Sequence, residues 1–474
     1  MDIDAATRKS LALATAIVGF TACHAALLTY RIPLVHSREG WFWNFRRTAL
    51  PGLWLFLPAI AFAFLGALFL ARRPSRRWGA IAVLILAGWI TQVSFALMEG
   101  KGLDGLQDRM VSTGHAGFAR EALRTDDYLE VARHYESLIA GHRLSGLCST
   151  KPPGQLLVYL LTLRASAILD LVATGIGRFT RLTIFASLTW PLMTYLVCLV
   201  MPPMGVQLGC RRAGAWAAIL FATAPNVTLV TLHLDQCLYP LLAACPALLF
   251  LHAARRRAGW SAALAGVTLY LGLFVTFSLL PLVLLIPLLA LLVPSPGTAA
   301  GGLRARARVV AIFLAAFALT DIAFRLSLDY DIARRYAGVI EAHVAWKHVD
   351  WTPLTIRHYA LLNVAEFALW SGLPLILLFA VRAIRALGRA GRRRLRAGDA
   401  FVLATAATLI AMAVLGRTAA ESGRLWMFML PFLCVPAGEE IAALGKERGR
   451  AVLWIAVLCQ LALVLATKSF QDFF

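Results

Sequence analysis

Charged residues are scarce in this chain: they make up 15% of its 474 residues, whereas hydrophobic residues make up 60%. The mean hydropathy is +0.72. A soluble protein of this length needs a polar surface, so the composition excludes a soluble globular protein. Apolar runs long enough to cross a hydrocarbon core recur along the sequence, and they predict an all-α, multi-pass helical bundle of roughly 13 to 15 transmembrane spans.

Acidic residues are scarcer than basic ones, 25 against 46, and the net charge is +21. Such a charge can indicate a nucleic-acid partner, but here the arginines cluster in short segments between apolar runs, as the positive-inside rule describes. We therefore expect membrane lipids and no nucleic acid as partners. The clusters lie at residues 72–77, 255–257, 304–308, 382–396 and 446–450. If they are cytoplasmic, the segments 99–153 and 327–360 face the extracytoplasmic side of an inner (plasma) membrane.

Several chemical signatures are absent. The eight cysteines form no CxxC pair and no Cys/His ligand spacing, so they predict neither a disulfide framework nor a metal site. No glycine-rich phosphate loop follows a strand, which argues against a nucleotide cofactor. The first apolar run, 11–30, lacks a small-residue cleavage pattern, and we expect no cleaved signal peptide. The absence of an internal repeat weakens a transporter interpretation.

The longest polar insert is the segment from Glu99 to Lys151, with apolar runs on both sides. Within it, apolar residues recur near helical spacing, which predicts one or two amphipathic helices on the membrane interface. These residues are Phe118, Ala122, Leu129, Ala132 and Leu138, with charged residues such as Glu121 between them. The segment ends at Lys151-Pro152-Pro153. Because each proline forces the preceding residue into an extended conformation, we expect a rigid corner there that presents the lysine.

The span count after this corner is open. Lys151 is expected outside and Arg211 inside, yet two apolar runs, 154–175 and 182–202, lie between them. Two full crossings would return the chain to the outside. Either one run is re-entrant or a short extra crossing lies in this region.

The order of these features resembles the GT-C glycosyltransferases, in particular the group with protein mannosyltransferases and aminoarabinose lipid A transferases. Gly114-His115-Ala116-Gly117-Phe118 stands where that group has an acidic pair and an aromatic residue, and Asp127-Tyr128 and Lys151-Pro152-Pro153 match later parts of the same loop. Further segments match the family less closely. They are Pro225 with Asp235, Asn363 to Phe367 with Gly372 and Pro374, and Glu421 to Trp426 with Pro431. The resemblance depends on the order of all these segments and on their expected location on the same side of the membrane.

The resemblance implies an inverting sugar transfer from a polyprenyl-phosphate donor to a hydroxyl of a lipid, glycan or protein acceptor. It implies residues 79–474 as the catalytic domain, with outer loops 99–153 and 327–360, after two N-terminal spans in residues 1–78. The reaction needs a base for the acceptor proton and cationic groups for the leaving phosphate. The resemblance implies no certain cofactor, and a divalent metal ion stays open.

Gly114-His115 replaces the acidic pair in which the family's catalytic acid lies, so the base must be sought nearby. Asp108 is the first choice and Asp104 the second. His115 is a further candidate, as a base or a metal ligand, because histidine titrates near physiological pH. The alternative is that both acids are solvated loop residues and that His115 is a polar residue at a helix start.

Lys151 and Arg424 are the candidates for the phosphate. Lys151 could instead reach lipid headgroups, and Arg424 could pair with Glu421 one helical turn away. Further candidates for substrate binding are Glu421, Asp127, Tyr128 and Asp235. Aromatic residues of the second outer loop, such as Tyr336 and Trp351, suit a sugar ring but suit an interfacial aromatic belt better.

Two rival functions remain. A transporter or flippase should carry charged residues inside its spans, and Asp170, Asp321 and Arg325 are the few candidates. A GT-C-like protein without catalytic activity is compatible with Gly114-His115 in place of the acidic pair.

Overall fold

The computed structural model describes nearly the whole chain as helices. The described residues are 4–30, 44–45, 47–72, 77–111, 116–125, 127–171, 175–230, 237–293, 299–347, 351–392, 395–415, 418 and 421–472. The one strand pair among them joins β1 (Asn44–Phe45) antiparallel to β2 (Gln471–Asp472). The class is therefore all-α, as the composition predicts.

The helices fall into four groups along the chain. The N-terminal group is α1 (Ala5–Thr29), the 3₁₀ helix η1 (Leu53–Leu55), α2 (Phe56–Arg72) and α3 (Arg77–Leu97). The polar insert and the start of the next apolar run form α4 (Gly102–Val111), α5 (Ala116–Arg124), α6 (Tyr128–Ala140), η3 (Cys148–Thr150), α7 (Pro153–Ala165) and η4 (Ser166–Leu171).

The central group is α8 (Arg178–Tyr195), η5 (Leu196–Leu199), α9 (Met201–Gln207), α10 (Arg211–Ala222), α11 (Pro225–Val230), α13 (Tyr239–Arg256), α14 (Gly259–Val275), η6 (Phe277–Leu279), α15 (Leu282–Leu292), α16 (Ala299–Leu328) and α17 (Ile332–Lys347). The C-terminal group is α18 (Pro353–Ser371), α19 (Leu373–Gly391), α20 (Ala397–Leu415), α21 (Ser422–Leu425), η7 (Met427–Met429), α22 (Leu430–Ala442) and α23 (Lys446–Phe470).

Seven of the described helical stretches are long and apolar enough to cross a membrane, which indicates a multi-pass membrane protein. They are Ala6–Thr29, Trp78–Leu97, Pro153–Leu171, Arg178–Gln207, Arg304–Leu328, Ala397–Leu415 and Lys446–Phe470. The bent pair of α18 and α19, which meet at 112°, raises the number to eight. The expectation of 13 to 15 spans is thus not met by the described helices, because breaks divide several apolar runs into helices too short to cross.

The break between α18 and α19 lies at Gly372, whose φ of +88° only glycine adopts without strain. Pro374 follows in the first turn of α19 and starts the new helix. Gly372 lies against Pro225 at the start of α11, since an added Cβ would come within 3.3 Å of its Cδ. The break therefore brings α11 next to the junction of α18 and α19.

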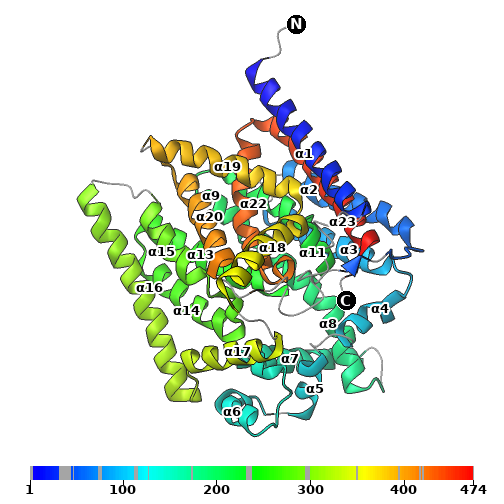
Figure 1. Cartoon of the computed structure of the whole chain (residues 1–474), viewed down its shortest axis with the longest axis vertical. Helices are drawn as coiled ribbons and strands as arrows, with labels where there is room; N and C mark the ends of the chain where they lie inside the picture. Colours follow the sequence, from blue (N-terminus) through cyan, green and yellow to red (C-terminus); the bar gives the residue numbers. More distant parts are fainter. Residues whose placement is uncertain are drawn as a thin grey trace.

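Helices of unlike character gather at opposite ends of the molecule (Figure 1). The arginine-rich α19, with α20 and α22, lies toward the upper end of the view, and α5, α6, α7 and α17 lie at the lower end. We call the latter four helices the lower layer. Helices α11 and α18 lie between the two ends. A large apolar core fills the bundle. A second core, with Phe118, Tyr159 and Trp190, lies where α5 and α6 pack against α7 and α8.

Candidate functional site

The corner after the polar insert has the predicted geometry. Lys151 is extended, at φ −137° and ψ 158°, and Pro152 likewise, at φ −74° and ψ 162°. Helix α7 begins at Pro153, where a missing N–H costs no helical hydrogen bond. At Gly154 an added Cβ would lie 2.4 Å from the carbonyl oxygen of Phe274, so glycine alone lets α7 pack on the end of α14. The expected rigid corner is confirmed.

The polar insert forms amphipathic helices, as predicted. Phe118 and Ala122 of α5 are fully buried, and Phe118 stacks on Tyr159 of α7 with ring centroids 5.5 Å apart. Two residues differ from the expected pattern. Leu129 is 57% exposed because it lies in the first turn of α6, outside the packed face. Glu121 is 3% exposed and accepts a hydrogen bond from Arg124 at 3.2 Å, so burial of this acid is offset by a cation one turn away.

An arginine ties the polar insert to the second outer loop. Arg335 of α17 is buried and donates from Nη1 to both carboxylate oxygens of Glu136 on α6, at 3.1 and 3.0 Å. Its Nη2 donates to the carbonyl oxygen of Ser149 at 2.7 Å. Close by, Tyr135 donates to the carbonyl oxygen of Cys148 at 2.9 Å, and burial raises the pKa of the Cys148 thiol to about 11. The lower layer is therefore fixed by buried polar contacts as well as by apolar packing.

The candidate bases lie around α4. Asp104 is exposed in the first turn of this helix, and Asp108 follows four residues later, on the same helical face. The side chain of Asp108, all of His115 and all of Asp235 lie outside the described residues. Among the described residues, no group of three or more His, Cys, Asp and Glu side chains is placed to hold a metal ion.

Three separate motifs meet in one buried polar cluster, which we call the Glu366 cluster and which consists of Asn226, Asn363, Glu366, Ser422 and Gly423. Glu366 Oε2 accepts hydrogen bonds from the backbone N–H and the hydroxyl of Ser422, at 3.0 and 2.9 Å. The same hydroxyl lies 2.7 Å from the carbonyl oxygen of Asn363, and Asn226 Nδ2 donates to the carbonyl oxygen of Gly423 at 3.2 Å. The cluster joins α11, α18 and α21.

Glu421 and Arg424 flank this cluster. Arg424 Nη2 donates to Glu421 Oε2 at 3.1 Å, and the Arg424 side chain is 23% exposed. The helical pairing that the sequence offered as the alternative for Arg424 is therefore present. The Arg424 side chain nevertheless remains partly exposed beside the cluster. Glu421 is buried, at 5% exposure.

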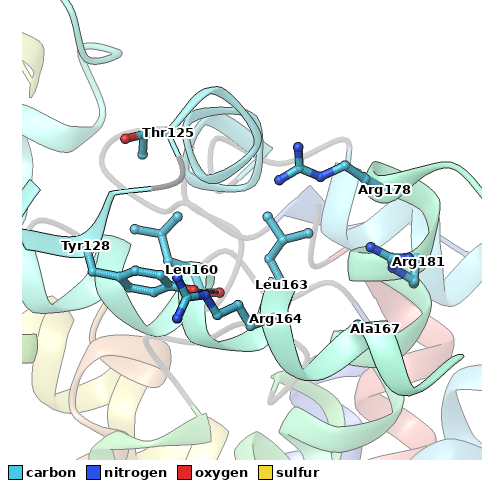
Figure 2. Close-up of a pocket in the computed structure, with 8 residues that line it drawn as sticks. All are labelled: Thr125, Tyr128, Leu160, Leu163, Arg164, Ala167, Arg178 and Arg181. Atoms are coloured by element: carbon cyan, nitrogen blue, oxygen red, sulfur yellow. Dashed lines mark hydrogen bonds between the residues drawn. The ribbon is translucent and has the colours of Figure 1, made fainter. Parts of the chain in front are cut away.

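Asp127 and Tyr128 are placed by the start of α6. Asp127 is the N-cap residue of this helix, and its carboxylate accepts from the N–H groups of Leu129 and Glu130 at 2.8 and 3.0 Å. Tyr128 donates to the carbonyl oxygen of Leu160 at 3.1 Å. Its ring lies under the guanidinium of Arg164, 4.0 Å from Cζ, at the edge of a cavity (Figure 2).

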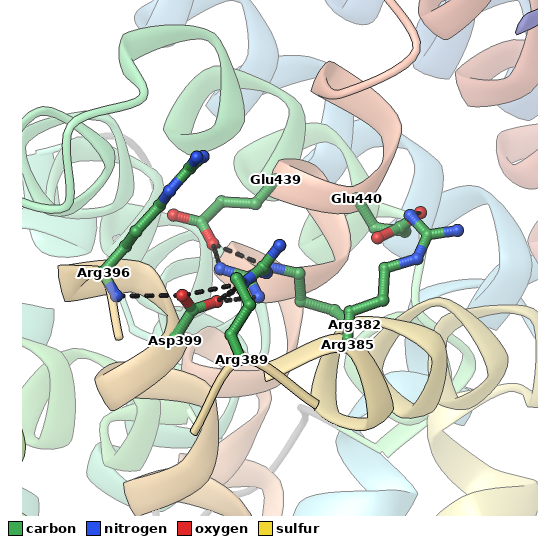
Figure 3. Close-up of polar contacts among 7 residues, drawn as sticks. All are labelled: Arg382, Arg385, Arg389, Arg396, Asp399, Glu439 and Glu440. Carbon is green, nitrogen blue, oxygen red and sulfur yellow. Dashed lines mark hydrogen bonds and ion pairs between the residues drawn. The ribbon is translucent and has the colours of Figure 1, made fainter. Parts of the chain in front are cut away.

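A dense ionic network joins α19, α20 and α22 (Figure 3). Asp399, fully buried at the start of α20, accepts from Arg382 at 2.6 Å and from Arg389 at 2.9 Å. Arg382 also pairs with Glu439, and Arg385 pairs with Glu440. From the sequence, these arginines were used only to assign the cytoplasmic side of the membrane. Their acidic partners, Asp399, Glu439 and Glu440, were not predicted. Each arginine of this network already has a carboxylate partner, which fits a structural role.

Two further features escaped sequence reasoning. Lys468 is 4% exposed and pairs with Glu99 at 2.6 Å, so it joins the end of α23 to the segment directly after α3. Glu366 was part of the motif from Asn363 to Phe367, but it was not predicted as a site residue. The detectable signal was an acid inside an apolar helix, which needs a partner when buried.

Comparison of the chain with protein-family models and with curated proteins finds no match.

Proposed function

We propose that the chain is a multi-pass membrane glycosyltransferase that moves a sugar from a polyprenyl-phosphate donor to an acceptor hydroxyl on the extracytoplasmic face. The observation that carries the proposal is the Glu366 cluster. Three motifs that resemble GT-C enzymes in sequence, and that are far apart along the chain, contribute to this cluster. Glu366 and Ser422 belong to two of them, and Asn226 follows Pro225 of the third. Their meeting in one buried set of contacts supports the resemblance.

The contacts of Glu366 suggest a positioning role rather than a reactive one. It is fully buried, and one of its oxygens accepts both donors of Ser422. Such contacts hold the turn that carries Glu421 and Arg424. The base is then sought among Asp108, Asp104 and His115, with Asp108 first, because a base must be reachable by the acceptor hydroxyl.

Lys151 and Arg424 are the proposed cations for the phosphate that leaves. Lys151 is partly exposed at the corner before α7, and Arg424 is partly exposed beside the Glu366 cluster. Charge-assisted hydrogen bonds from such groups stabilise a phosphate leaving group. Asp127, Tyr128 and Asp235 complete the proposed substrate-binding set.

The test is sugar transfer by membranes that contain the wild-type chain or the variants Asp108→Asn and Asp104→Asn, with a panel of radiolabelled polyprenyl-phosphate sugars. The matched control is Asp329→Asn, because Asp329 is an exposed acid between α16 and α17 whose left-handed backbone, φ +51°, asparagine tolerates. Loss of a general base lowers the rate by about 10²- to 10⁴-fold. Parallel assays with and without a chelator test the metal ion.

We expect transfer by the wild type and the control, and a loss with Asp108→Asn at unchanged expression. Transfer retained in Asp108→Asn but lost in Asp104→Asn would move the base to Asp104, and transfer retained in both would leave His115. If the wild type transfers no sugar from any donor, the result favours the two rival functions. Movement of labelled lipid between leaflets would then indicate a flippase, and its absence a GT-C-like protein without catalytic activity.

A further inference from the structure

The cavity between α6, α7 and α8 is basic. Its volume is about 360 Å³, within the range typical of small-molecule pockets. Figure 2 shows Tyr128 and Arg164 on one side and Arg178 and Arg181, both from the start of α8, on the other. The lining is completed by Thr125, Leu160, Leu163 and Ala167. Three guanidinium groups thus surround one hollow, and none of these eight lining residues is acidic.

Two described acids lie near the cavity. Asp170 pairs with Arg181 through Nη1, and Asp127 is occupied as the N-cap of α6. Arg181 Nε is buried and makes no hydrogen bond among the described residues. A buried donor without an acceptor is costly and marks a place where a ligand or ion completes the site. Gly177 precedes α8 without a capping side chain, so the positive end of the helix dipole adds to the same field.

The surroundings of the cavity are apolar and exposed. Ile168 and Leu171 of η4, directly after α7, are 58% and 85% exposed, respectively. Side chains of this kind beside a basic pocket are typical of groups that enter a membrane interface. Helices α6 and α7, which border the cavity, lie at the end opposite to the arginine-rich α19 (Figure 1), where the positive-inside pattern predicts no cluster of arginines.

We propose that this cavity binds the phosphate group of a phosphate monoester, with Arg164, Arg178 and Arg181 as its donors. Guanidinium groups match phosphate oxygens in geometry and charge, and the stacking on Tyr128 holds Arg164 in place for this purpose. The phosphate is carried either by a lipid, whose chains then lie along Ile168 and Leu171, or by a small soluble molecule. This site does not depend on the proposed sugar transfer.

The experiment measures ligand retention by the purified full-length chain in a neutral detergent, by native mass spectrometry. The lipid probes are dioleoyl phosphatidic acid and dioleoyl phosphatidylcholine, and the soluble probe is glycerol 3-phosphate. The main variant is Ala167→Glu, which adds an acid at the cavity wall and removes no existing contact, with Ala167→Gln as its neutral match. A second variant, Arg164→Gln/Arg178→Gln, is compared with Arg133→Gln, which alters an exposed arginine of α6.

We expect the wild type to retain phosphatidic acid over phosphatidylcholine, and Ala167→Glu to lower this retention about tenfold while Ala167→Gln leaves it unchanged. Retention of phosphatidic acid alone assigns the site to a lipid headgroup, and retention of glycerol 3-phosphate as well assigns it to phosphate esters in general. Equal retention of both lipids by the wild type without retention of glycerol 3-phosphate, or equal retention by the Ala167→Glu and Ala167→Gln variants, would overturn the proposal. If the double variant fails to fold, the Ala167 pair decides alone.

Discussion

At the scale of single residues, the Ser422 hydroxyl has an unusually dense set of contacts. It lies 2.9 Å from Glu366 Oε2 and 2.7 Å from the carbonyl oxygen of Asn363, and all three groups are buried. An ionised or polar group in an apolar interior is tolerated only when such partners are present. The stability of the turn that carries Arg424 therefore depends on one small side chain.

We predict that Ser422→Ala lowers the free energy of unfolding by about 1–3 kcal/mol, because Glu366 loses a donor in a buried site. The measurement is the thermal unfolding midpoint in detergent. The control is Ser137→Ala, since the Ser137 hydroxyl is exposed and bonds only its own helix at His134. An unfolding midpoint for Ser422→Ala equal to that of the control would refute the structural role given to the cluster.

At the scale of elements, α7 accounts for the open span count after Lys151. By length and composition the stretch Pro153–Leu171 qualifies as a span. Yet α5 and α6 cover α7, because Tyr128 reaches the Leu160 carbonyl and Phe118 stacks on Tyr159. We infer that α7, as part of the lower layer, does not cross the membrane. The stretch from α8 to α9, Arg178–Gln207, then makes the crossing. In this arrangement one crossing separates Lys151 from Arg211, which fits the sidedness expected from the sequence.

The lower layer should loosen when its central arginine is removed. We predict that Arg335→Gln speeds hydrogen–deuterium exchange in α6 and η3, because the variant loses the bidentate contact with Glu136, each charged hydrogen bond contributing about 1.5–3 kcal/mol. The neighbouring Arg334→Gln is the matched control, since Arg334 is exposed while Arg335 is buried. If exchange in residues 128–150 were the same in both variants, α6 would be held by apolar packing alone.

At the scale of the whole molecule, the two ends are built on different principles. The upper end is held by charge: Arg382, Arg389 and Asp399 join α19 to α20, Glu439 joins them to α22, and Glu440 lies 4.0 Å from Lys9 of α1. The lower end combines an apolar core between α5, α6, α7 and α8 with the ion pair of Arg335 and Glu136.

We predict that Asp399→Asn destabilises the whole chain by about 3–5 kcal/mol, because it removes the buried carboxylate that the buried Arg382 and the partly exposed Arg389 share. The exposed pair of Asp4 and Arg448 provides the control, and Asp4→Asn should leave the unfolding midpoint almost unchanged because water screens this pair. The unfolding midpoint and the yield of folded protein measure both. Similar losses in the two variants would mean that the network contributes no more than a surface ion pair.

The sequence by itself determined the all-α membrane class, the helices of the polar insert and the proline corner at Lys151. These follow from local causes: apolar run length, helical periodicity, and the backbone limits of proline. Only the tertiary structure decided that Asn226, Glu366 and Ser422 meet, that acids hold the arginines of α19, and that α7 lies under α5 and α6. Such contacts join residues far apart in the chain, and the packing of whole helices, not any local pattern, selects them.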